Sequence, residues 1–184
     1  MKSFFKKGII ETGLDEVARG CLFGRVYAAS VIWRSDNDLD NLLKQLNINK
    51  MVIKDSKKIK PQKRKELRDY IETVALDYSV SWSCQKEIDK YNIRNATFKA
   101  MHRSLDSLVL KPQSLIVDGT DFEIYNMTNH QCIIKGDDTY TSIAAASILA
   151  KVYHDEYIEE LIKENPELKK YDIQNNMGYG TKKH

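Results

Sequence analysis

Five short runs of apolar residues predict the strands of a sheet. Residues 25–33 (RVYAASVIW) are rich in β-branched and aromatic side chains, and residues 78–84 alternate larger side chains with serines. Residues 8–16 predict a strand that ends on an acidic pair. SLIV (114–117) and CIIK (132–135) are continuous apolar runs, which are typical of strands covered on both faces.

Helical spacing occurs in three longer segments and one short one. Apolar residues three and four apart predict helices over 62–76, after Pro61, and over 94–109. Residues 141–164 form the clearest helix, and the polar stretch 35–50 contains one short amphipathic segment, LDNLLKQL. Three strands followed by strands alternating with helices predict an α/β protein with a mixed five-stranded sheet flanked by helices.

Composition restricts the class of protein. With 184 residues, 42% hydrophobic and 30% charged, the chain predicts one soluble domain spanning 1–184. No apolar run has the length that crosses a bilayer, and the N-terminus lacks a signal peptide, so we expect a cytoplasmic protein without a membrane partner. Three widely spaced cysteines predict reduced thiols, and a net charge of +3 permits a nucleic-acid partner without requiring one.

Acidic residues follow three of the predicted strands. Asp15 and Glu16 end the first, Asp118 ends LIVD, and Asp137 follows CIIKG. Ligands gather outside the carboxyl ends of parallel strands, where four carboxylates would repel one another unless a divalent cation were present. Oxygen ligands favour Mg²⁺ or Mn²⁺. Taken singly, each acid also suits a turn or a helix cap, and Asp138 is expected to face water or to cap.

Six ordered blocks resemble ribonuclease HII, the type 2 ribonuclease H. They are GLDEVARG (13–20), DSKKIKPQKR (55–64), IDKYNIRNATFKAM (88–101), IVDG (116–119), KGDDTYTSIAAASILAKVYHD (135–155) and GYGTKKH (178–184). The resemblance implies a ribonuclease H-like fold with a helical C-terminal portion. It also implies an endonuclease that hydrolyses the RNA of RNA/DNA hybrids and cuts 5′ of ribonucleotides embedded in duplex DNA, leaving 3′-hydroxyl and 5′-phosphate ends.

The resemblance assigns roles residue by residue. The catalytic and metal-binding carboxylates are Asp15, Glu16, Asp118 and Asp137, which would hold two Mg²⁺ or Mn²⁺ ions. The residues expected to bind substrate are Ala18, Arg19, Gly20, Lys57, Ser142, Lys151 and Tyr179. The residues expected to support the site are Asp155, Lys58 and His184. Asp155 lies well inside a helix by its spacing, where it can simply pair with a lysine.

Two positions depart from the pattern of the family, and a third, His184, matches its histidine but is the last residue of the sequence. Ala18 replaces the first glycine of a Gly-Arg-Gly turn, and its methyl group could hinder a close backbone approach or forbid a positive φ. We therefore expect cleavage at single ribonucleotides to survive, with a weakened preference over long hybrids. His154 replaces an arginine, so a phosphate contact could be lost. His184 is the last residue, so the end is either frayed or lacks the family's usual C-terminal extension.

Several other readings stay open at this point. The rival functions are ribonuclease HIII, another ribonuclease H-like nuclease such as a resolvase, a non-catalytic module that binds hybrids, and a structural subunit. The resemblance to ribonuclease HII implies a role in ribonucleotide excision repair and DNA replication. It also implies a location wherever the host or viral DNA is replicated. A replication clamp is a conceivable partner without support in the sequence, and we expect a monomer.

Overall fold

The computed structural model describes residues 1–53, 56 and 59–182. Its strands are β1 (Glu11–Val17), β2 (Val26–Ile32), β3 (Asp77–Ser83), β4 (Ser114–Asp118) and β5 (His130–Ile133). Its longer helices are α1 (Asp36–Leu46), α2 (Pro61–Val74), α3 (Gln85–Asp106) and α5 (Thr141–Glu164). Its short helical elements are α4 (Gly136–Thr139), η2 (Pro166–Tyr171) and α6 (Ile173–Asn176).

The sheet is mixed, as the sequence predicts. Its order is β3-β2-β1-β4-β5, with β1, β4 and β5 parallel and with β2 and β3 antiparallel to their neighbours. The predicted α/β class with five strands and flanking helices is therefore confirmed. Among the residues that the structure describes, no helix combines the length and apolar character needed to cross a membrane.

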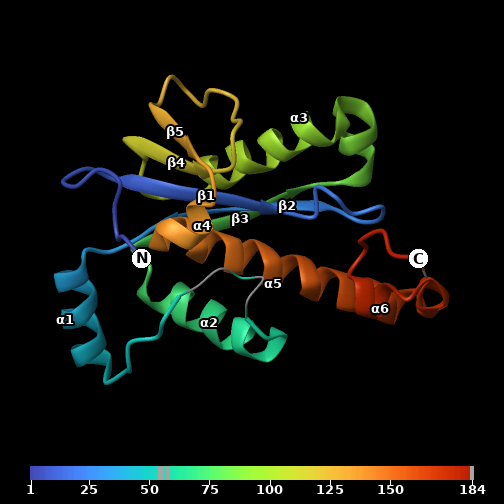
Figure 1. The fold of residues 1–184 in the computed structure, drawn as a ribbon, viewed down its shortest axis with the longest axis horizontal. Helices are drawn as coiled ribbons and strands as arrows, with labels where there is room; N and C mark the ends of the chain where they lie inside the picture. Colours follow the sequence, from blue (N-terminus) through green and yellow to red (C-terminus); the bar gives the residue numbers. More distant parts are fainter. Residues whose placement is uncertain (54–55, 57–58, 183–184) are drawn as a thin grey trace.

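The helices cover both faces of the sheet (Figure 1). On one face α3 packs against Leu14, Ala28 and Ile32. On the other face α5 and α2 pack against Ala29 and Val31. Adjacent residues of β1 and β2 thus serve opposite layers, as the two-residue period of a strand requires.

Two element boundaries differ from the prediction. The helix expected over 94–109 is the second part of α3, which begins at Gln85 and is interrupted at Asn92, where φ is 65° and ψ is 165°. The Asn92 side chain accepts a hydrogen bond from the Asn95 N–H at 3.0 Å, so it caps the second part. The strand expected at 132–135 ends at Ile133, because Lys135 takes a left-handed conformation that starts α4.

Gly13 lets α5 lie directly on β1. A Cβ atom built at Gly13 would lie 2.5 Å from the Ser142 carbonyl carbon and 2.6 Å from the Ile143 nitrogen. Both are backbone atoms, which a rotamer change cannot move. The absence of a side chain at this position therefore sets the distance between the strand that carries Asp15 and the longest helix.

We expect Gly13→Ala to lower the free energy of unfolding by about 3 kcal/mol, because α5 must move away from the sheet. Gly20→Ala is the control, since its Cβ would meet nothing closer than a Tyr179 ring carbon at 3.9 Å. That variant should stay within about 0.5 kcal/mol of the parent in urea unfolding. Equal effects of the two substitutions would contradict the close contact at Gly13.

Candidate active site

Three carboxylates meet at the carboxyl ends of the parallel strands. Asp15 and Asp118 follow Leu14 and Val117, which are paired in the β1–β4 register, and Asp137 lies in α4 just after β5. One carboxylate oxygen from each lies within 4.8 Å of the other two. Asp15 and Asp137 are each only 5% exposed. The crossover of the chain therefore assembles an acidic cluster from three separate segments.

Glu16 lies on the other face of β1. Its register partner Ala28 packs in the α3 layer, whereas Ala29, opposite Asp15, packs in the α5 layer. Glu16 accepts a hydrogen bond from Arg19 at 3.3 Å and lies outside the cluster of three acids. Adjacent acids thus face opposite layers, and Arg19 partly compensates the charge of Glu16.

The charge of the cluster is only partly compensated. Burial raises the pKa of Asp15 well above its usual value, and the charges of Glu16 and Asp118 raise it further. Hydrogen bonds from the Ser147 hydroxyl and from the Glu16 N–H, at 2.7 Å, act in the opposite direction. A cation bound beside Asp15 would favour its ionised form and so act against this rise in its pKa.

A backbone hydrogen bond holds the side chain of Asp118 in place. The Gly136 N–H donates to Asp118 Oδ1 at 2.7 Å, which ties α4 to the end of β4. A Cβ atom at Gly136 would lie 2.6 Å from Ile143 Cδ1, so a larger residue there would require the Ile143 side chain to move. Sequence reasoning missed the role of Gly136, although its place before Asp137 was a usable signal. Asp138 is exposed, as expected.

The donor set fits a hard divalent cation. All three groups in the cluster offer carboxylate oxygens, and the described residues place no thiol or imidazole among them. The raised pKa of Asp15 shows the electrostatic cost that such an ion would remove. Asp15, Asp118 and Asp137 are therefore the residues that could hold it, with Glu16 beside them.

The turn after β1 contains a residue with a positive φ, although that residue is an alanine. Ala18 has a φ of 76° and is 4% exposed, and its carbonyl accepts a hydrogen bond from the Cys21 N–H at 3.1 Å. The alternative that alanine would forbid a positive φ at this position is therefore wrong. Arg19 and Gly20 are exposed at the tip of the turn.

Tyr179 comes to this turn from the far end of the chain. It forms an isolated antiparallel bridge with Cys21, and the Leu22 N–H donates to the Gly178 carbonyl at 2.9 Å. Burial raises the pKa of Tyr179 to about 12, so its phenol is neutral over the physiological range. The structure thus brings together Ala18, Gly20 and Tyr179, which the resemblance assigns to substrate.

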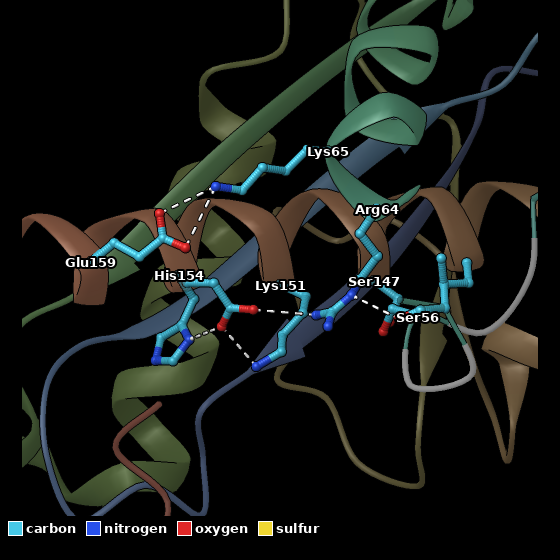
Figure 2. A network of polar contacts seen from close by, with 9 residues as sticks. Ser56, Arg64, Lys65, Ser147, Lys151, His154 and Glu159 are labelled. Carbon is cyan, nitrogen blue, oxygen red and sulfur yellow. Dashed lines mark hydrogen bonds and ion pairs between the residues drawn. The ribbon is translucent and has the colours of Figure 1, made fainter. Parts of the chain in front are cut away.

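Polar side chains of α5, including Ser147, Lys151 and His154, take part in a network with residues of α2 (Figure 2). The Ser147 hydroxyl lies close enough to Asp15 to lower its pKa, and it shares a hydrogen bond of 2.9 Å with Ser56. One turn further along the helix, Lys151 donates to Asp155 at 2.7 Å. Asp155 pairs with a lysine, as the spacing suggested. Sequence reasoning did not single out Ser147, although a serine four residues before Lys151 in an alanine-rich run was a signal.

Among the remaining residues predicted to contact substrate or to support the site, the structure describes Ser142. Ser142 is 2% exposed and lies against Gly13, so its hydroxyl does not reach the surface in this structure. Lys57, Lys58 and His184 lie outside the described residues. Cys21, Cys84 and Cys132 are free thiols, as expected.

A five-stranded mixed sheet with an acidic cluster at the ends of its parallel strands defines a nuclease of the ribonuclease H-like class. The family model for Ribonuclease HII matches residues 12–184. A Ribonuclease HII of Phocaeicola vulgatus is 46% identical over 183 residues, which cover 98% of this chain and 83% of that protein. The chain therefore belongs to the ribonuclease HII family and is a ribonuclease H.

Solved structures agree with this fold. Ribonuclease H2 from Pyrococcus horikoshii OT3 matches with a TM-score of 0.72 and 25% identity, covering 94% of this chain and 81% of that one. A structure of Bst-RNase HIII in complex with Mn²⁺ matches with a TM-score of 0.63 and 19% identity, covering 84% of this chain and 54% of that one. The predicted ribonuclease H-like fold is thereby confirmed.

We expect Asp118→Asn to stabilise the metal-free protein by about 1 kcal/mol, because it removes one of the charges that repel Asp15. The asparagine oxygen can still accept the Gly136 hydrogen bond. For a chain of this size the melting temperature should rise by about 2–4 °C. Added Mg²⁺ or Mn²⁺ should stabilise the parent protein more than the variant in calorimetry. An equal shift by the ions in both proteins would place the cation elsewhere.

Proposed function

We propose that this ribonuclease H cleaves the RNA strand of RNA/DNA hybrids and cuts 5′ of ribonucleotides embedded in duplex DNA. The observation that carries the proposal is the meeting of Asp15, Asp118 and Asp137 within 4.8 Å at the ends of the parallel strands. Family membership supports the hybrid as a substrate. The products would be a 3′-hydroxyl and a 5′-phosphate.

In this proposal Asp15, Glu16, Asp118 and Asp137 would hold two Mg²⁺ or Mn²⁺ ions. When bound, such ions activate water and stabilise the charge on a leaving oxygen. The protein positions these carboxylates: the Glu16 N–H donates a hydrogen bond to Asp15, and the Gly136 N–H donates one to Asp118. The complex of Bst-RNase HIII with Mn²⁺ supports a cation of this type.

Recognition of the sugar would take place at the turn after β1. Arg19 and Gly20 are exposed there, beside the ring of Tyr179. Backbone groups of such a turn can reach the ribose 2′-hydroxyl, which separates RNA from DNA. A tyrosine ring beside the turn can stack on the neighbouring sugar. These positions support the assignment of Arg19, Gly20 and Tyr179 to the substrate.

A non-catalytic module that binds hybrids is the alternative function. The intact acidic cluster and the match to an enzyme family favour catalysis. Several expectations from the sequence stay predictions. They are the domain extent, the monomeric state, a cytoplasmic location, a role in repair or replication, and contact with a replication clamp.

The first test is cleavage of a duplex with one embedded ribonucleotide, beside an RNA/DNA hybrid, with Mg²⁺, Mn²⁺ or EDTA. Asp118→Asn should lower both rates by more than about a hundredfold. Even the substitution of a residue that only hydrogen-bonds to a metal ligand lowers activity or metal affinity by ~10–100-fold. Asp138→Asn is the matched control on the exposed neighbour of Asp137 and should keep the parent rates. Hybrid binding without any cleavage by the parent protein would favour the non-catalytic module.

Ala18 yields a second prediction, on substrate preference. Its methyl group is buried and its φ is already that of a glycine, so neither reason for a weakened preference is present in the structure. Ala18→Gly should therefore change the ratio of kcat/KM for embedded ribonucleotides to that for hybrids by less than about twofold.

Ala18→Val is the contrasting variant, because a β-branched residue at a φ of 76° is strongly disfavoured. It should distort the turn and lower this ratio. A large gain in the ratio from Ala18→Gly would show that the methyl group does obstruct the substrate.

A further inference from the structure

Asp155 is a buried carboxylate that the acidic cluster does not include. Its side chain is 12% exposed, and it lies eight residues after Ser147 on α5, which is about 12 Å along the helix. It accepts hydrogen bonds from Lys151 at 2.7 Å and from Arg64 at 3.2 Å, and it contacts His154 Nδ1 at 3.2 Å. Figure 2 shows these three basic side chains converging from α2 and α5.

Lys151 connects this carboxylate to the C-terminal segment. Its ammonium lies 5.5 Å from the centroid of the Tyr179 ring, within the range of a cation–π contact. A lysine head group on a four-carbon stem is mobile unless something fixes it. The bond to Asp155 is what holds this ammonium against the tyrosine.

The same groups lie close to the turn after β1. Burial raises the pKa of Cys21 to about 11, the charge of Lys151 lowers it in part, and that of Asp155 raises it. A cavity of about 280 Å³ lies beside these side chains, and its lining includes Arg64, Lys151, Asp155 and Tyr179. One chain of contacts therefore runs from α2 through Asp155 and Lys151 to Tyr179 and the turn.

We propose that Asp155 is a positioning residue for sugar recognition: it holds Lys151 under Tyr179 and so fixes the C-terminal segment against the turn formed by residues 18–21. This role separates it from the acids that would hold metal. The effect on preference between substrates rests on the proposed function. The effect on the C-terminal segment does not depend on that function.

Hydrogen exchange of the full chain without metal or substrate tests the positioning directly. The amides of Cys21, Leu22 and Tyr179 donate to Ala18, Gly178 and Asn176, so they report on the turn and on the segment. In Asp155→Asn, peptides covering 18–22 and 177–181 should exchange at least about fivefold faster. Glu159→Gln is the matched control, because Glu159 lines the same cavity but pairs with Lys65. It should leave both peptides unchanged.

Lys151→Met tests whether Asp155 acts on the C-terminal segment through the Lys151 ammonium or only through a general contribution to the fold. It leaves Asp155 with Arg64 and His154 but removes the ammonium beside Tyr179. Faster exchange at 18–22 and 177–181 in this variant supports the proposal, including the case in which Asp155→Asn fails to fold. Unchanged exchange there in Lys151→Met overturns it. So does a folded Asp155→Asn protein in which only α2 exchanges faster.

Cleavage assays and calorimetry measure the preference between substrates and the affinity for metal separately. Asp155→Asn should lower the ratio of kcat/KM for an embedded ribonucleotide to that for a hybrid by about fivefold or more. Its affinity for Mn²⁺ in calorimetry should stay within about twofold of the parent. A large loss of Mn²⁺ affinity would make Asp155 part of the metal site and overturn the proposal. If the parent protein cleaves neither substrate, the proposed function fails, while hydrogen exchange still decides the role of Asp155.

Discussion

The repulsion among buried carboxylates at the end of the sheet is the constraint on which the rest of the site depends. Asp15 and Asp137 are almost inaccessible to solvent, and Asp118 adds a third carboxylate at short range. Water screens the charges of the two buried acids poorly, so the fold must supply energy to hold the three groups together. It does so through a sheet whose two faces are both covered by apolar layers. The binding of a cation would recover that energy.

Helix α5 organises the surroundings of the cluster because it lies so close to β1. Gly13 permits the approach of the helix, which brings Ser147 to Asp15. The residues that follow on the same face, Lys151 and Asp155, recur at intervals of four. A single helix face therefore leads from a hydroxyl close to Asp15 to groups that lie beside the C-terminal segment.

The turn after β1 shows how a local preference is overridden. Alanine rarely adopts a φ of 76°, yet Ala18 does so, with its methyl group buried and its carbonyl bonded to Cys21. The pairing of Cys21 with Tyr179 holds the other side of the turn. Tertiary contacts thus maintain a conformation that the family pattern would have assigned to glycine.

The strands, the mixed sheet, the family resemblance and the acids after the strands were all predictable from the amino-acid sequence. The spacing of apolar residues and the position of an acid after a strand are local properties that a sequence records directly. The sequence did not show that Glu16 would face the α3 layer or that Asn92 would interrupt α3, since both outcomes depend on register and packing. The folded chain was needed to show which distant residues lie close together, such as Ser147 near Asp15, and Tyr179 beside the turn. A linear pattern records which residues are present, whereas their distances are set by the packing of the whole domain.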